Sequence, residues 1–350
     1  MRLVTKAAFS RFSLSLAGAR GDRCGVTLRH SILVAVAVAL IGSTPGLANI
    51  SFYINYSSDV TGLANFSSVQ SAVNYVANEY STLYSNNITL YITVGCFESA
   101  GNCTNSGLGG SSTNLIPSSY AAIRAGLVAD SDDPVDASFD ASLPATDPIG
   151  GTHDWWVPCA ESKALSLGGC GTGAGADGEF DFNALLSYTF DPNNRAVSGE
   201  FDFIGVAEHE FSEIMGRIFG LGASIGGAPS YLPNDLDRFT GAGTRSFANC
   251  QLTTTSGIYL SANNGTTNVT NFNNNSGGDC DDYDGTVATD PYNAFTGTDQ
   301  AHALNAADDT NMEILGYDLA APEPSTFVLV GAALLGAGFL RHRLQARNKA

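Results

Sequence analysis

The segment 204–219, IGVAEHEFSEIMGRIF, constrains the fold of this chain more than any other segment. On a helix, where successive residues are about 100° apart, its apolar residues form one stripe. These residues are Ala207, Phe211, Ile214, Met215 and Ile218. His209 and Glu213 lie one turn apart on the other side, followed by Gly216 and then Gly220 beyond the segment. The pattern predicts a helix that packs its stripe on a core and leaves open space above the two glycines.

The polar side of this helix carries residue types suited to a hydrolytic metal site. The pattern His-Glu-x-x-Glu is similar to the zinc-binding pattern H-E-x-x-H, with Glu213 in place of the second histidine. His209 and Glu213 would be metal ligands, and Glu210 would take a proton from the water that the ion acidifies. Zn²⁺ accepts such ligands, and the single imidazole also favours Mn or Fe. The alternative is an acidic helix in which Glu213 pairs with Arg217.

A catalytic zinc ion takes three protein ligands, so the third must come from outside the helix. Asp235 and Asp237 follow it in the segment NDLDRF, although Asp235 could instead cap a turn. His153 and His302 are more distant candidates. The acidic stretch 278–285 is compatible with Ca²⁺, but it lacks the EF-hand spacing, and a solvated acidic loop is its alternative.

The remaining patterns predict an α+β fold in the region 49–319. Helical spacing and a serine cap favour helices, β-branched and aromatic runs favour strands, and Asp/Pro-rich sequence favours loops. We expect helices at 69–83, 117–130 and 306–318, a strand at 88–95, two strands and a turn in 178–197, a loop at 130–151, and β-structure with long loops at 222–300.

The two ends predict export. Arginines precede an apolar run at 32–41 and a small-residue stretch, so residues 1–48 are expected to be a secretory leader. At the other end, residues 320–350 contain an uncharged apolar run, 326–340, followed by basic residues, which indicates a transmembrane segment with a cytoplasmic end. The net charge of -18 argues against nucleic acid as a partner.

The cysteines also indicate export. Six remain after the leader, in three local pairs, and they lack the C-x-x-C spacing of zinc sites. Disulfides in an oxidising compartment are therefore expected. Local pairing suggests Cys96–Cys103, Cys159–Cys170 and Cys250–Cys280, although 15 connectivities are formally open.

The tail resembles the PEP-CTERM sorting signal of Gram-negative bacteria, because PEPS, a short apolar helix and an arginine cluster occur in that order within 322–350. The resemblance implies that the tail holds the precursor in the inner membrane. There an exosortase would process it, which would place the mature chain outside the cell or on its surface.

The stretch DPNNRAVSGEFDFIGVAEHEFSEIMGR, at 191–217, resembles a zincin-like family of PEP-CTERM-sorted metalloproteases. Shorter matches, such as ITVG and NDLDRF, extend the resemblance over most of the mature chain. It implies a zincin-like mixed sheet with an active-site helix, a loop-rich β-containing C-terminal part, and Asp235 as the third ligand. Glu213 and Phe219 depart from the metzincin pattern H-E-x-x-H-x-x-G-x-x-H at its second and third histidines.

Two functions follow as hypotheses. The first is an exported zinc-dependent metallopeptidase that hydrolyses peptide or protein substrates, with Glu210 as general base. The second is a non-catalytic matrix or envelope protein with a degenerate zincin-like site.

Overall fold

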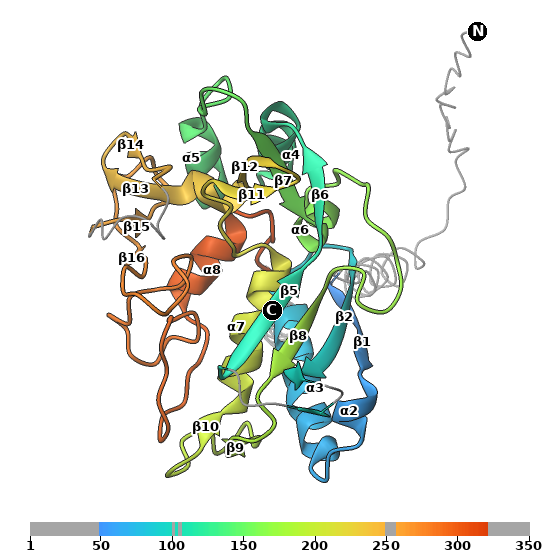
Figure 1. Ribbon diagram of the computed structural model, residues 1–350. Coiled ribbons are helices and arrows are strands. Elements are labelled where there is room, and N and C mark those ends of the chain that lie inside the picture. The colour runs from blue at the N-terminus through green and yellow to red at the C-terminus, as the bar shows by residue number, and fades with distance from the viewer. Residues whose placement is uncertain (1–48, 100–101, 104–106, 249–256, 321–350) are drawn as a thin grey trace, which may run out of the picture. The chain divides into compact units, whose positions relative to one another are not determined.

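The largest sheet combines three parallel strands with one antiparallel strand at its edge (Figure 1). The structure, a computed structural model, describes residues 49–99, 102–103, 107–248 and 257–320. In spatial order the strands are β1 (Ser51–Tyr56), β2 (Thr89–Cys96), β8 (Gly178–Phe182) and β5 (Gly109–Thr113). The predicted strand at 88–95 is confirmed as β2.

Two helices pack on one face of this sheet. They are α3 (Phe66–Leu83) and α7 (Phe203–Met215). Phe52 of β1 contacts both helices, because its ring lies 6.5 Å from that of Tyr80 on α3 and 5.9 Å from that of Phe211 on α7. The predicted apolar spacing on α3 is confirmed, since Val73 and Tyr80 are among its buried residues. The apolar stripe of α7 faces the sheet, and its polar residues Glu210 and Glu213 lie beside the edge strand β5.

The remaining elements form smaller sheets and helices around this core. One sheet contains β6 (Leu115–Ser118), β7 (Asp154–Pro158), β12 (Ala228–Tyr231) and β11 (Ala223–Ile225). Another contains β13 (Arg238–Gly241), β14 (Thr244–Arg245), β15 (Tyr259–Leu260) and β16 (Thr270–Asn271). Two-stranded pairs are β3 (Glu98–Ser99) with β4 (Asn102–Cys103), and β9 (Tyr188–Thr189) with β10 (Phe201–Asp202). The other helices are α2 (Ser58–Thr61), α4 (Tyr120–Asp130), α5 (Pro134–Ser142), α6 (Cys159–Ala164), the 3₁₀ helix η1 (Pro233–Asp237) and α8 (Ala306–Glu313). The chain is therefore α+β with mixed sheets, as predicted.

The prediction of a loop at 130–151 is wrong, because helix α5 lies within it. Asp133 caps the helix, with its side chain accepting hydrogen bonds from the backbone N–H groups of Val135 and Asp136. Pro134 follows in the first helical turn, where a missing N–H costs nothing. The Asp-Pro pair that favours a loop is therefore a helix start signal here.

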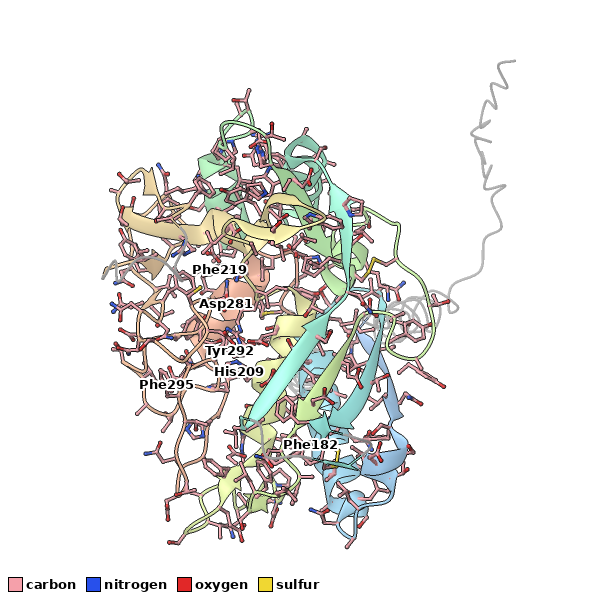
Figure 2. All side chains as sticks on the ribbon, in the orientation of Figure 1. Phe182, His209, Phe219, Asp281, Tyr292 and Phe295 are labelled. Carbon is pink, nitrogen blue, oxygen red and sulfur yellow. A yellow bond between two sulfur atoms is a disulfide. The ribbon has the colours of Figure 1, made fainter. Side chains whose placement is uncertain are left out.

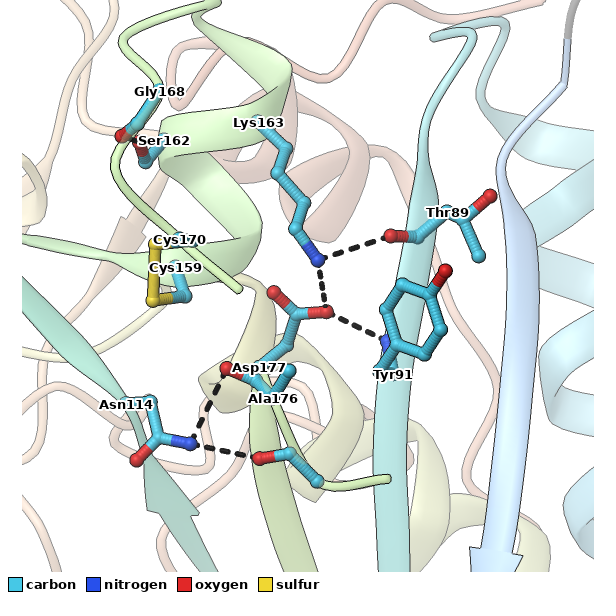
Figure 3. Close-up of a disulfide and its surroundings, with 11 residues drawn as sticks. Thr89, Tyr91, Asn114, Cys159, Ser162, Lys163, Gly168, Cys170, Ala176 and Asp177 are labelled. Atoms are coloured by element: carbon cyan, nitrogen blue, oxygen red, sulfur yellow. Dashed lines mark hydrogen bonds and ion pairs between the residues drawn. A yellow bond between two sulfur atoms is a disulfide. The ribbon is translucent and has the colours of Figure 1, made fainter. Parts of the chain in front are cut away.

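Two of the predicted disulfides are confirmed. They are Cys96–Cys103 and Cys159–Cys170. Figure 3 shows the second at the start of α6, near the ion pair in which Lys163 Nζ lies 2.5 Å from Asp177 Oδ2. Cys280 is also disulfide-bonded, but its predicted partner, Cys250, lies outside the described residues.

The predicted leader, 1–48, and the apolar run of the tail, 326–340, also lie outside the described residues. Within the described part of the chain, every helix is too short or too polar to cross a bilayer. The described residues belong to one compact unit.

Candidate functional site

Helix α7 carries all three predicted residues of the helical motif. It starts at Phe203, where Asp202 accepts a hydrogen bond from the Ile204 N–H, and it ends at Met215. The prediction that it continues to residue 219 is wrong. Gly216 follows with φ 133°, a conformation that stops a helix and that residues with a Cβ rarely adopt.

The expected open space above the two glycines is also absent. A Cβ on Gly216 would lie 2.9 Å from Glu161 Oε2, and one on Gly220 would lie 2.7 Å from Tyr231 Cα. Elements α6 and β12 therefore fill this region, and the glycines permit close packing. The accessible side of α7 lies nearer its middle, around His209 and Glu213.

His209 lies at the centre of a cluster of three possible metal ligands. Its Nε2 is 3.1 Å from Glu213 Oε1 and 3.2 Å from Asp282 Oδ1. One ligand atom from each of His209, Glu213 and Asp282 lies within 4.8 Å of the other two. The other ring nitrogen, Nδ1, is 2.8 Å from the carbonyl oxygen of Pro291. Figure 2 shows His209 beside Tyr292, whose ring it meets edge-on at 6.5 Å between centroids.

Arg217 also contacts the same carboxylate oxygens of Glu213 and Asp282. Its guanidinium is 2.9 Å from Asp282 Oδ1 and 3.4 Å from Glu213 Oε1. Its Nε also donates to Ser212 Oγ at 2.8 Å, and the group lies over the Tyr292 ring at 4.5 Å. The i,i+4 pair between Glu213 and Arg217, the alternative read from the sequence, is thus present.

These contacts set the charges of the cluster. Burial would lower the pKa of His209, but Asp282 and Glu213 outweigh it and hold this pKa well above its ordinary value. Burial would raise the pKa of Glu213, but His209, Arg217 and a 2.7 Å hydrogen bond from Ser111 Oγ lower it to about 2. Two cations, His209 and Arg217, therefore face two carboxylates, Glu213 and Asp282.

The pKa of Glu210 is shifted in the opposite direction from that of Glu213. It is 6% exposed, and both burial and the neighbouring Glu213 carboxylate raise its pKa well above the ordinary value. A side-chain hydrogen bond with Glu213 contributes to this rise. Paired carboxyl groups with separated pKa values are typical of acid–base sites.

Strand β5 forms the wall next to Glu210. A Cβ on Gly109 would lie 2.4 Å from Glu210 Oε1 and 2.7 Å from Val206 Cγ1, so only glycine leaves room for this carboxyl group. A pocket of about 560 Å³ opens here between β5, α7 and the segment 277–302. Its lining includes the residues of the cluster and Glu210, together with Gly109, Ser111, Asp279, Phe295 and His302.

The structure brings Asp282, and not Asp235, to His209 and Glu213. The Asp235 carboxylate is fully buried and accepts hydrogen bonds from the backbone N–H groups of Gly220, Leu221 and Leu232. It therefore holds the turns after α7, which is the capping alternative. Asp237 is also directed elsewhere, since its Oδ2 accepts from the Asn311 side chain.

The two distant histidines differ. His153 pairs with Asp147 at 3.0 Å, packs on Tyr231, and is absent from the pocket lining. His302 lines the pocket, with Nε2 2.7 Å from Thr296 Oγ1. Burial lowers the pKa of His302, which favours the neutral imidazole.

The acidic stretch 278–285 supplies the ligand that sequence reasoning missed. Asp282 binds His209 and Arg217, and Asp281 Oδ2 accepts from the Phe219 N–H. Two of the four aspartates considered for Ca²⁺ thus hold α7 and the segment after it. The clustering of aspartates in the sequence was the available signal. Because this stretch is far from the helix along the chain, the contact between Asp282 and His209 could not be predicted.

The chain matches no protein-family model, no curated protein and no solved structure. The resemblance to zincin-like metalloproteases stays a prediction.

Proposed function

We propose that this protein is a metal-dependent peptidase with a zincin-like site on α7. The observation that carries the proposal is the convergence of His209, Glu213 and Asp282 on one wall of a pocket that also contains Glu210. The zincin-like fold belongs to the proposal and is supported by an antiparallel edge strand that runs beside a helix with a metal-ligand motif.

The donor set suits a divalent cation. The carbonyl of Pro291 binds His209 Nδ1, which directs Nε2 toward the carboxylates, as is usual for histidines that bind metals. One imidazole and two carboxylates suit Zn²⁺, Mn²⁺ or Fe²⁺. The ion would replace the proton on His209, and Arg217 would continue to orient Glu213 and Asp282. When bound, it would polarise the scissile carbonyl and acidify water.

Peptide binding is supported by the free edge of β5. Among the described strands, β5 pairs only with β8, and its residues Gly109, Gly110 and Ser111 line the pocket. An extended peptide could add to this edge through backbone hydrogen bonds. This would place the scissile amide beside Glu210. The Glu210 carboxylate would accept a proton from water and then donate it to the leaving nitrogen. A raised pKa suits this role.

One observation favours a second candidate, a non-catalytic matrix or envelope protein with a degenerate site. Arg217 and protonated His209 already balance the charges of Glu213 and Asp282. The cluster is therefore electrostatically satisfied without an ion, and it could serve only to hold α7 against the segment 281–292.

Metal analysis and three substitutions distinguish the candidates. For a peptidase, the purified protein prepared without chelators should hold about one transition-metal ion per chain. His209→Ala or Asp282→Asn should lose it, with at least about 100-fold weaker affinity. Glu210→Gln should keep the metal but reduce peptide hydrolysis about 10²–10⁴-fold.

His153→Ala is the matched control for the histidine substitution, because His153 is absent from the pocket lining, and it should retain both properties. Wild-type protein without stoichiometric metal or hydrolysis would establish the second candidate. Retention of metal by Asp282→Asn together with its loss by Asp235→Asn would restore the ligand set read from the sequence.

A further inference from the structure

A second cluster of carboxylates lies where α4 ends and α5 begins. One carboxylate oxygen from each of Asp132, Asp136 and Asp318 lies within 4.8 Å of the other two. Asp132 belongs to the connection between the helices, Asp136 to the first turn of α5, and Asp318 to the segment after α8. None of them lines the pocket beside α7.

The cluster contains a buried acceptor that has no donor. Asp136 is only 6% exposed, and its Oδ2 has no hydrogen-bond partner. The Asp136 carboxyl group has a hydrogen bond with the Asp132 backbone, but this bond does not satisfy Oδ2. Oδ1 of Asp318 is also buried and unpaired. Burying such groups without a partner is costly, so they require either protons or a bound cation.

No basic side chain supplies that charge. Among the ion pairs of the described residues, none involves Asp132, Asp136 or Asp318. Elsewhere in the core Lys163 neutralises Asp177, and Arg195 neutralises Asp202 and Glu208. Glu161 also has unpaired buried oxygens, but among the described residues no two further carboxylates gather around it as they do around Asp136. Proteins normally pair buried charges or use them to coordinate metals.

We propose that Asp132, Asp136 and Asp318 bind a calcium ion. All three ligands are carboxylate oxygens, which suit a hard cation and not zinc or copper. Ca²⁺ takes six to eight oxygen ligands in flexible geometry, and the exposed side of Asp132 leaves positions for water. A further unpaired oxygen, Asp130 Oδ2, lies 3.0 Å from the position of a Cβ on Gly316, two residues before Asp318.

The ion would join three parts of the chain. Asp318 is already tied to Asn86, since its N–H donates to Asn86 Oδ1 at 3.0 Å. Calcium would add the α4–α5 connection and helix α5 to this contact. It would therefore fix the C-terminal end of the described domain to two of its helices. This role is structural and does not depend on the proposed peptidase function.

Thermal unfolding of the purified protein, after EDTA treatment and dialysis, tests the proposal. Added Ca²⁺ at about 100 times its Kd should raise the midpoint of the wild-type protein by about 5 °C or more. Asp136→Asn and Asp132→Asn should abolish or strongly reduce this shift. Asp154→Asn is the matched control, because it removes the same charge from an exposed residue outside the cluster, and it should keep the shift.

Two further measurements separate calcium binding from other effects. In EDTA, Asp136→Asn should be at least as stable as the wild type, because it relieves repulsion between carboxylates, so a lost response cannot be attributed to misfolding. His209→Ala should respond to Ca²⁺ like the wild type, whatever the outcome for the site on α7. The proposal is overturned if 10 mM Ca²⁺ leaves the wild-type midpoint unchanged, or if Asp132→Asn and Asp136→Asn shift as the wild type does.

Discussion

His209 is the residue at which the two candidate functions differ physically. As a metal ligand its imidazole is neutral, with Nδ1–H donating to Pro291 and Nε2 free to bind an ion. As part of a salt-bridge network it is an imidazolium ion between Glu213 and Asp282. The two states differ by one proton on Nε2, so its titration reports which one is present.

In metal-free protein, His209 should remain protonated well above pH 6.5, because Asp282 and Glu213 outweigh the effect of burial on its pKa. Its charge then stabilises the fold at low pH, and this contribution is lost as pH rises through the folded-state pKa. Imidazole ¹⁵N NMR measures it directly. His302 is the internal comparison, since burial lowers its pKa and it should be neutral at pH 6.5. Titration of His209 below pH 6.5 would contradict the salt-bridge network.

At this scale, sequence identified the helix residues of the site but not the third carboxylate. His209 and Glu213 are four residues apart, so helical geometry alone brings them together. Asp282 is 69 positions beyond Glu213, and its approach depends on the path of a long, irregular segment. Asp235 is nearer in sequence, but backbone N–H groups left free after α7 occupy its carboxylate.

At the scale of elements, the close approach of β5 to α7 defines the pocket. Gly109 allows this approach, since a side chain there would meet Glu210 and Val206. Sequence predicted the long amphipathic helices because their period is strong. It missed α5 because Asp133 and Pro134 are both loop formers and helix starters, and only the hydrogen bonds of the cap decide between these roles.

Gly109→Ala should push Glu210 away from β5 and destabilise the protein by about 1–3 kcal/mol, as overpacking typically does. Denaturant unfolding measures the loss. Gly150→Ala is the matched control, because a Cβ there meets nothing within 4 Å, and it should stay within about 0.5 kcal/mol of the wild type. Equal stability of the two variants would show that β5 and α7 are not in close contact in solution.

At the scale of the whole molecule, acidity is the dominant property. The chain has 34 Asp and Glu against 16 Lys and Arg. Composition therefore predicted a chain unsuited to nucleic acid, but it could not show that many acids are buried. Glu161, Asp237 and Asp308 are at most 1% exposed, and desolvation raises the pKa of each well above its ordinary value. Export and tail processing stay predictions from sequence, because the residues concerned lie outside the described ranges.

These buried acids predict how stability depends on pH. The unfolded chain releases their protons near pH 4, whereas the folded chain keeps them to higher pH, so stability should fall as pH rises from about 5 to 8. Asp181 contributes in the lower part of this range, since burial and Glu179 raise its pKa to about 6. The raised pKa of His209 acts in the same direction. The lowered pKa of His302 acts in the opposite direction, but it is one group against several acids.

Urea unfolding midpoints in EDTA at pH 5, 6.5 and 8, at constant ionic strength, should decrease in that order. Asp181→Asn should reduce the decrease between pH 5 and 6.5, because it removes a group that must ionise in the folded state. A midpoint that rises with pH would mean that the acids are ionised and paired with cations in the folded protein.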